Sequence, residues 1–496
     1  MIGAVFLALL LVAAALALLA HLRREAALKN FPPGPRRWPV LGSLPSMPGT
    51  LVHQHAHRHW LPRYGTVVGL TLPGGQDMVM VCGGEEVIAI LNHEHCQLRP
   101  DVFLARERAF GKRLGISLAD GPHWTEQRRF TLRELRDLGL GKSKLEGVIL
   151  DEANATIRAM VADGPKLEPN FLFNAPVLNV LWWMVSGKEF ARGAGSTLDE
   201  RSRKLLVVLN QAMRHKKIVT AACDNFPILK YVAPEWSSYN EIYKPIFKIQ
   251  DYLREEIQEQ RLKGVGDSYM LKYTEEINKG RPGGFTDENL IINCLDMFTA
   301  GGESTANTLS FCLMYMGLYP EVQARVHAEL DAAIGGADKT VTMSDKPNLP
   351  FLEATLLEVI RSNTISPLAI PHMNSQDIQL NGYTIPKGAT LMLSMWSVLN
   401  DKKHWGDPEV FRPDRFLDKE GKFTKDPWLI PFGIGKRNCI GEAFALQVAF
   451  IFFSNLMNRF TFTLPPGSER PSTVNVQAGL TVTPPEYSII ATPRVS

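Results

Sequence analysis

The chain has 496 residues, 45% of them hydrophobic, and its formal net charge is +3. A charge so close to neutral gives no support for nucleic acid or a strongly acidic molecule as a partner. The cysteines have neither paired nor metal-finger spacing, which favours a reducing compartment over a disulfide framework. They are Cys82, Cys96, Cys223, Cys294, Cys312 and Cys439.

The amino-terminal end is apolar. Residues 2–20 carry no charged or hydrogen-bonding side chain, and as an α-helix they are about long enough to cross the hydrocarbon core of a bilayer. We therefore predict a transmembrane anchor over residues 1–21, followed by a basic and proline-rich linker over residues 22–45. A cleaved secretory signal is the alternative, although the basic residues follow the apolar run instead of preceding it.

Residues 46–496 predict one large domain, because they contain no internal repeat and no low-complexity tract. Its early elements are expected to be helix, strand, strand and helix, at residues 52–64, 66–72, 78–82 and 85–91. Residues 99–118 lack a clear period and predict a long loop of the kind that is often functional. Helical patterns dominate the rest, and small sheets are expected at residues 377–392 and 475–492. The predicted class is mainly α with small β-sheets (α+β).

Trp124 and Arg128 are four residues apart in a helical pattern. They then point from one face, where an indole N–H and a guanidinium can bind the same anion. A tryptophan that packs against the arginine stem is the alternative.

A long apolar helix is predicted from the N-cap Thr286 to about residue 318. Its middle reads Ala300-Gly301-Gly302-Glu303-Ser304-Thr305. Each glycine inside a helix costs about 1 kcal/mol relative to alanine, so the pair needs a reason. A backbone without side chains admits a flat ligand, and a carboxylate beside hydroxyl groups can relay protons. The alternative is a crossing point of small residues between packed helices.

Glu358 and Arg361 are three residues apart on an otherwise apolar helix, so they can pair. A charge pair on such a helix is expected to be buried and to need a third partner, for which Arg415 is the candidate. After this helix, residues 367–372 form an extended segment with apolar side chains and one histidine, His372.

Cys439 lies between glycines, beside two cations and just ahead of an apolar helical run. The glycines let backbone donors approach its sulfur, and the positive end of the following helix favours an anion there. Cys439 is therefore a candidate thiolate ligand of a metal. Taken alone, it is equally well explained as a small buried hydrophobic residue.

Four separated features together resemble the cytochrome P450 family of haem-thiolate monooxygenases, over essentially the whole chain. They are the loop Phe432-x-x-Gly435-x-Arg437-x-Cys439-x-Gly441, the pair Glu358-x-x-Arg361, residues 411–416 and residues 300–305. The resemblance implies the cytochrome P450 fold with an N-terminal transmembrane helix, and haem b (iron protoporphyrin IX) as the cofactor. It implies Cys439 as the iron ligand and a structural triad of Glu358, Arg361 and Arg415. The implied haem-binding residues are Arg99, Trp124, Arg128, Ala300, Gly301, His372, Phe432, Arg437 and Cys439.

The resemblance also implies that Glu303, Ser304 and Thr305 are catalytic and deliver protons to dioxygen. The family most often has threonine directly after the acid, whereas this chain has Ser304 followed by Thr305. A serine hydroxyl can do the same chemistry but is held less rigidly. Either hydroxyl therefore remains a candidate for the proton relay.

The implied activity is a membrane-bound monooxygenase that inserts one oxygen atom from O2 into a lipophilic substrate. Its electrons would come from NADPH through a separate reductase, because the sequence has no flavin- or nicotinamide-binding fingerprint. The implied location is the endoplasmic reticulum membrane, with the lipid bilayer as a partner and the catalytic domain in the cytosol. Basic residues that could dock the reductase are Arg129, Arg133, Arg136, Lys142 and Lys436.

An apolar pocket lining favours a lipophilic substrate of terpenoid or steroid size. The residues expected to line it, with Ala300, are Phe103, Leu104, Phe110, Met297, Phe298, Leu368, Ile370, Leu480 and Val482. Residues 171–183, 234–235 and 396–409 resemble arthropod juvenile-hormone-pathway epoxidases, which implies epoxidation of methyl farnesoate or farnesoic acid. An ecdysteroid-type steroid hydroxylase and a broad xenobiotic monooxygenase are the alternatives. A non-catalytic haem-binding sensor is a remoter one, because a pure binder has no need of a proton relay.

Overall fold

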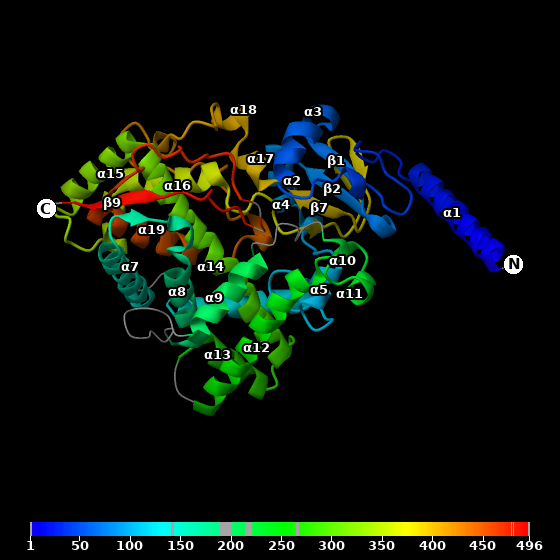
Figure 1. Cartoon of the computed structure of the whole chain (residues 1–496), viewed down its shortest axis with the longest axis horizontal. Coiled ribbons are helices and arrows are strands. Elements are labelled where there is room, and N and C mark those ends of the chain that lie inside the picture. Colours follow the sequence, from blue (N-terminus) through cyan, green and yellow to red (C-terminus); the bar gives the residue numbers. More distant parts are fainter. Residues whose placement is uncertain are drawn as a thin grey trace.

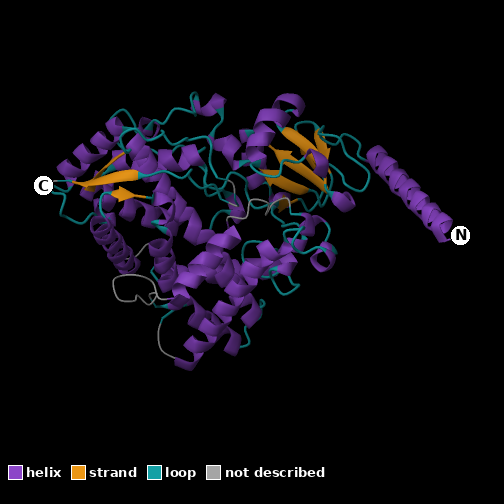
Figure 2. Ribbon diagram, in the orientation of Figure 1, coloured by secondary structure: helices purple, strands orange, loops and turns teal. Residues whose placement is uncertain are grey.

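The fold is mainly helical, with small sheets on two sides of the helical body (Figures 1 and 2). A computed structural model describes residues 2–139, 143–188, 200–213, 221–263, 267–477, 479 and 481–494. The predicted class, mainly α with small β-sheets, is confirmed.

The helices of the amino-terminal half include one continuous helical segment that agrees with the prediction for residues 52–64. It consists of α2, a π-helical turn at Ala56–Trp60 and α3. The helices of this half are α1 Ile2–Ala27, α2 Val52–His55, α3 Leu61–Tyr64, α4 Gly84–Asn92, α5 Phe103–Glu107, α6 Gly121–Asp137, α7 Ser143–Asp163, α8 Asn174–Ser186, α9 Glu200–Met213, α10 Ala222–Asn225, α11 Leu229–Val232 and α12 Tyr239–Lys263.

The later helices include α14, whose 32 residues run through the middle of the body (Figure 1). They are α13 Tyr269–Asn278, α14 Asp287–Leu318, α15 Pro320–Ala333, α16 Pro350–Asn363, α17 Met395–Leu399, α18 Lys402–Trp405 and α19 Glu442–Arg459. The short helix α5 lies inside the region that the sequence predicts as a long loop.

The larger sheet joins strands from both halves of the chain in the order β1-β2-β7-β4. These strands are β1 Val67–Thr71, β2 Asp77–Val81, β7 Thr390–Leu393 and β4 His372–Met373. Strand β2 runs parallel to β7, with Val79 opposite Leu391, whereas β1 and β4 pair antiparallel with their neighbours. Alternation in the sequence predicts strands near these places, but it does not predict the parallel pairing.

Two smaller antiparallel sheets complete the fold. The order of the first is β3-β9-β8, and the second is the pair β5-β6. Their strands are β3 Lys166–Leu167, β9 Ile489–Pro493, β8 Phe460–Thr463, β5 Ile378–Leu380 and β6 Tyr383–Ile385. The small sheets expected near residues 377–392 and 475–492 are therefore present.

Helix α14 begins as predicted. The hydroxyl of Thr286 accepts a hydrogen bond from the backbone N–H of Asn289 at 3.2 Å, and two acidic residues occupy the first turn. Such a cap satisfies one of the free N–H groups of the helix, and acidic side chains there complement the helix dipole. The helix then contacts α8, α12, α16 and α19, which makes it the central element of the core.

The paired glycines of α14 lie where this helix packs against α8. A Cβ atom on Gly301 would lie 3.0 Å from Leu181 Cδ2, and one on Gly302 would lie 3.5 Å from Leu178 Cδ1. The close approach of α8 thus accounts for the absent side chain of Gly301. For this pair the geometry supports the crossing-point alternative, while the neighbouring Ala300 is exposed.

Helix α1 projects from the body beside the larger sheet (Figure 1). It extends to Ala27, so the predicted boundary between anchor and linker at residue 21 falls inside this helix. Within the described ranges, no helix combines the length and apolarity that a membrane span requires, and the predicted transmembrane anchor is not confirmed.

A buried ion-pair group ties α16 to the segment that follows α18. The carboxylate of Glu358 accepts from Arg361 at 2.7 and 2.8 Å and from Arg415 at 3.3 Å. Arg361 also donates to the carbonyls of Leu399 and Pro408, each at 2.8 Å. The side chains of Glu358 and Arg361 are 0% exposed. The three predicted partners are therefore in contact. Their other donors are bound by backbone carbonyls and by the side chains of Ser362 and Asp407.

Replacing Arg361 with methionine should destabilise the protein by about 3–5 kcal/mol, because the carboxylate of Glu358 would lose its main buried partner. Chemical unfolding followed by circular dichroism measures this loss. The matched control is Arg254→Met, which breaks the exposed pair with Asp251 and should cost less than about 1 kcal/mol. A loss for Arg361→Met no larger than that of the control would contradict a stabilising role.

Candidate active site

The loop before α19 presents Cys439 three residues ahead of the first helical residue, Glu442. The backbone N–H of Cys439 donates to the carbonyl of Phe432 at 2.8 Å and closes the loop. Gly435 has a φ angle of 76°, and a Cβ atom there would lie 2.6 Å from the carbonyl oxygen of Leu91. Only glycine suits that position, so the loop geometry depends on the predicted motif.

The six cysteines all lie in the described part of the chain, and Cys439 is the exposed one. Although its side chain is accessible, protein surrounds it, and this burial raises the pKa of the thiol. The hydrogen bonds from the backbone N–H groups of Gly441 and Glu442 and the charge of Arg128 act in the opposite direction, while the carboxylate of Glu442 adds to the rise, so the pKa of the thiol stays above its usual value. These donors favour the thiolate, which is the form of cysteine that binds a metal.

Four predicted cofactor-binding residues lie close together: Arg99 and His372, which are buried, and Arg128 and Arg437, which are half-buried. The three arginines carry the positive charge and are called the positive cluster below. Burial, then the charges of Arg437 and Arg128, hold the pKa of Arg99 well below its usual value. Burial and the charge of Arg99 lower the pKa of His372 to about 3, and burial lowers the pKa of Arg437 to about 10. Cations that disfavour one another in this way are stabilised by a bound anion, and bidentate arginine suits carboxylates.

Backbone and amide oxygens hold the side chains of Arg128, His372 and Arg437 in place. Arg128 donates to the carbonyl and to the side-chain oxygen of Asn438, at 2.8 and 2.6 Å. Arg437 donates to two backbone carbonyls at 2.8 Å each, and Nδ1 of His372 lies 2.7 Å from the carbonyl of Cys96. Asn438 was not among the predicted site residues. Its position directly before Cys439 is the signal that could have identified it.

Trp124 supports the cluster through its ring. The guanidinium of Arg437 lies 3.5 Å from the centre of the indole ring, whereas that of Arg128 lies 5.8 Å away. The indole N–H donates to the carbonyl of Ile116 at 3.0 Å. The packing alternative describes this geometry better than a shared anion does, although the arginine over the ring is Arg437 and not the expected Arg128.

The predicted proton-relay residues of α14 point in different directions. Ser304 lies on the accessible face with Ala300, and its hydroxyl donates to the Ala300 carbonyl at 2.7 Å. Thr305 is 2% exposed, and its hydroxyl has no hydrogen-bond partner among the described residues. Glu303 is 5% exposed, and its carboxylate accepts from the hydroxyl of Thr481 at 3.1 Å. Thr481 was missed in the sequence because no motif marks it.

The residues predicted to line the substrate pocket fall into two groups. Phe103 of α5 lies against Tyr243 of α12, with ring centres 5.8 Å apart. Phe298, in contrast, is buried against Trp182 of α8 at 5.3 Å, so it belongs to the core between two helices. Leu104, Phe110 and Leu368 are half-buried, Ile370 is exposed, Met297 and Val482 are buried, and Leu480 lies outside the described residues.

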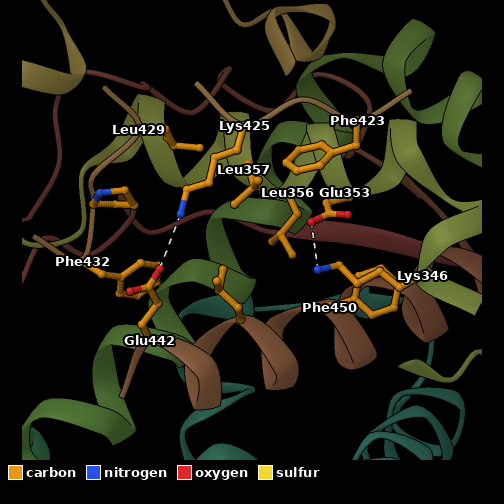
Figure 3. Close-up of a pocket in the computed structure, with 12 residues that line it drawn as sticks. Lys346, Glu353, Leu356, Leu357, Phe423, Lys425, Leu429, Phe432, Glu442 and Phe450 are labelled. Carbon is orange, nitrogen blue, oxygen red and sulfur yellow. Dashed lines mark ion pairs between the residues drawn. The ribbon is translucent and has the colours of Figure 1, made fainter. Parts of the chain in front are cut away.

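Two cavities border the cysteine loop. The smaller has a volume of about 80 Å³ between α16 and α19, and two ion pairs lie at its edge (Figure 3). These pairs are Lys346 with Glu353 at 2.8 Å and Lys425 with Glu442 at 3.6 Å. The second has a volume of about 410 Å³, and Phe432 lines both. None of the residues predicted to contact substrate lines either cavity, so we assign neither to the substrate.

Comparison with known proteins identifies the family of the chain. A family model described as Cytochrome P450 matches residues 32–491. The chain belongs to the cytochrome P450 family. It is thus a cytochrome P450 monooxygenase, as the resemblance implied.

Several relatives match nearly the full length of this P450. "Farnesoate epoxidase" of Bombyx mori is 34% identical over 479 residues, which cover 94% of each chain. "Probable cytochrome P450 305a1" of Drosophila melanogaster is 34% identical over 479 residues, 93% of this chain and 94% of the relative. "Cytochrome P450 2J2" of Homo sapiens is 33% identical over 495 residues, 98% of this chain and 96% of the relative.

The family implies a haem-thiolate cofactor, and the residues of this chain fit it. Cys439 offers an accessible sulfur that backbone N–H groups support. The positive cluster offers guanidinium groups for the two propionates of haem. The exposed Ala300 leaves the backbone of α14 open on that face, whereas Gly301 faces α8.

Proposed function

We propose that this P450 oxidises a lipophilic substrate of terpenoid size, and that epoxidation of a farnesoid, either methyl farnesoate or farnesoic acid, is its reaction. The observation that carries the proposal is the full-length similarity to a protein named farnesoate epoxidase. The aromatic and aliphatic residues of α5 and the following loop support an apolar ligand. Relatives whose names state no substrate have nearly the same identity, so hydroxylation of a steroid and oxidation of xenobiotics stay open as competing proposals.

In the proposed mechanism, the side chains around the haem have separate roles. The bound haem would supply iron that activates dioxygen and transfers one oxygen atom. Cys439 ligates the iron, and the N–H groups of Gly441 and Glu442 stabilise the negative charge on its sulfur. The positive cluster would hold the haem propionates through charge-assisted hydrogen bonds. On the opposite side, Glu303 and a neighbouring hydroxyl hold and move protons.

Ser304 is the better candidate for that hydroxyl. Its side chain is accessible and lies one helical turn after the exposed Ala300, whose carbonyl already accepts its hydrogen bond. Thr305, in contrast, is only 2% exposed. A serine in this place does the chemistry of the more common threonine with a less constrained side chain.

Replacing Ser304 with alanine should lower the product formed per NADPH several-fold, with the difference appearing as hydrogen peroxide, because one proton-transfer group is lost. Thr305→Val is the matched control and should leave the ratio close to that of the wild type. Parallel assays of product, peroxide and NADPH measure the effect. A fall for Thr305→Val alone would assign the relay to Thr305, and no change in either variant would remove the hydroxyl from the mechanism.

A separate reductase is the proposed electron donor. Exposed cations on α6 and in the cysteine loop support the docking of an acidic partner on this side. They are Arg129, Arg133, Arg136 and Lys436, and Lys142 lies outside the described residues. Arg129 and Arg133 also pair with Glu126 and Glu134, so part of their charge is compensated within α6.

Attachment to the endoplasmic reticulum membrane through α1, with the catalytic domain in the cytosol, is the proposed location. Among the side chains of α1 whose burial the structure describes, ten large apolar ones are exposed, and a lipid environment would cover them. They are Val5, Phe6, Leu7, Leu9, Leu11, Val12, Leu16, Leu18, Leu19 and Leu22.

Removal of residues 2–27 should move the protein from the sedimented membranes to the supernatant of a cell extract, because the exposed apolar helix is then gone. The matched control is the full-length Arg24→Gln variant, which loses the ion pair with Asp77 but keeps the helix. It should remain with the membranes. Full-length protein in the supernatant would contradict the proposed attachment.

The substrate assignment is tested with the full-length protein, its reductase and NADPH. Methyl farnesoate and farnesoic acid should yield an epoxide, at least tenfold faster than ecdysteroid precursors are hydroxylated, a ratio that corresponds to about 1.4 kcal/mol. Product should be absent without the reductase and in Cys439→Ser. Faster turnover of sterols, or comparable turnover of unrelated xenobiotics, would favour the corresponding alternative.

A further inference from the structure

Residues 481–483, near the carboxyl end, form a buried polar contact with the middle of α14. The hydroxyl of Thr481 donates to Oε2 of Glu303 at 3.1 Å. One turn later, the side-chain amide of Asn307 donates to the carbonyl of Val482 and to the hydroxyl of Thr483, both at 3.1 Å. All five residues are buried. The segment therefore follows the same stretch of α14 that carries the proposed relay.

Backbone hydrogen bonds also connect Val482 and Thr483 to parts of the chain outside α14. The backbone N–H of Val482 donates to the carbonyl of Ile365, in the stretch after α16, at 2.9 Å. Thr483 exchanges two backbone hydrogen bonds with Gln477, at 2.9 and 3.2 Å. Because these bonds fix the backbone of Val482 and Thr483, they restrict the position of the neighbouring Thr481.

We propose that Thr481 is a positioning residue of the monooxygenase reaction, whose hydroxyl holds the carboxylate of Glu303 in the orientation that proton delivery needs. This inference rests on the proposed relay role of Glu303. A glutamate side chain on a helix has three rotatable bonds, and a charge-assisted hydrogen bond restricts them.

The choice of threonine fits this role. Its branched Cβ restricts the side chain to few rotamers, so the donor stays aimed at Glu303. Val482, which follows it, is a predicted substrate contact. The segment would thus link a residue near the substrate to the residue that delivers protons.

The experiment compares Thr481→Val, which keeps the shape but removes the donor, with Thr481→Ser, which keeps the donor. In full-length holoenzyme with reductase, Thr481→Val should lower product per NADPH about fivefold, the ratio that one hydrogen bond of average strength represents, and raise peroxide accordingly. It should also enlarge the solvent deuterium isotope effect on product formation. Thr481→Ser should restore both values to near those of the wild type.

Two further variants separate this inference from a general structural effect. Thr483→Val removes the neighbouring hydroxyl, which bonds to Asn307 and not to Glu303, and should leave the ratio unchanged. Haem content and the carbon monoxide difference spectrum should be the same in all variants. If Thr481→Val does not retain haem, Thr481→Ala repeats the test with a smaller side chain. An equal fall in Thr483→Val, or no rescue by serine, would overturn the positioning role.

Glu303→Gln distinguishes the inference from the proposed function beneath it. If Glu303→Gln uncouples turnover and Thr481→Val does not, the positioning role is wrong while the relay stands. If Glu303→Gln leaves the ratio unchanged, the relay itself is wrong, and the inference falls with it. We expect Glu303→Gln to lower the product formed per NADPH. The double variant with Thr481→Val should show no further decrease, since both changes act through one carboxylate.

Discussion

Helix α14 is the central element of the core, and it also carries one face of the candidate active site. Where α8 crosses it, a Cβ atom on Gly301 would lie 3.0 Å from Leu181 Cδ2, so a larger residue would require that leucine side chain to shift. On another face, Ala300 and Ser304 stay accessible. The position of the catalytic face is therefore set by the packing of the opposite face, so the core of this P450 cannot be separated from its chemistry.

The opposite wall of the site depends on electrostatics more than on packing. Arg99, Arg128 and Arg437 are brought together where burial and mutual repulsion disfavour their charges. Backbone carbonyls, the amide of Asn438 and the ring of Trp124 offset part of that cost. An anionic cofactor would offset more of it, because each carboxylate adds charge-assisted hydrogen bonds. Such an arrangement links cofactor binding to the stability of the loop that carries Cys439.

Much of the framework could be predicted because its causes are local. The Thr286 cap, the spacing of Glu358 and Arg361, and the glycines around Cys439 each depend on neighbours within a few residues. The parallel pairing of β2 with β7 could not be predicted, since it joins segments from both halves of the chain. The sequence also did not predict in which direction a side chain points. The helical pattern places Phe298 in α14, but it does not show that this side chain packs on α8.

The residues near the substrate are the hardest to predict, because distant contacts place them. Helix α5, which carries Phe103, is held by Glu107, whose carboxylate accepts from Lys230 at 3.2 Å and from Tyr239 at 2.5 Å. Those partners come from α11 and α12, and none of these contacts follows a sequence motif. The motifs that identify the family determine how oxygen is activated. The residues expected to contact the substrate are positioned instead by long-range contacts, which no motif in the sequence reveals.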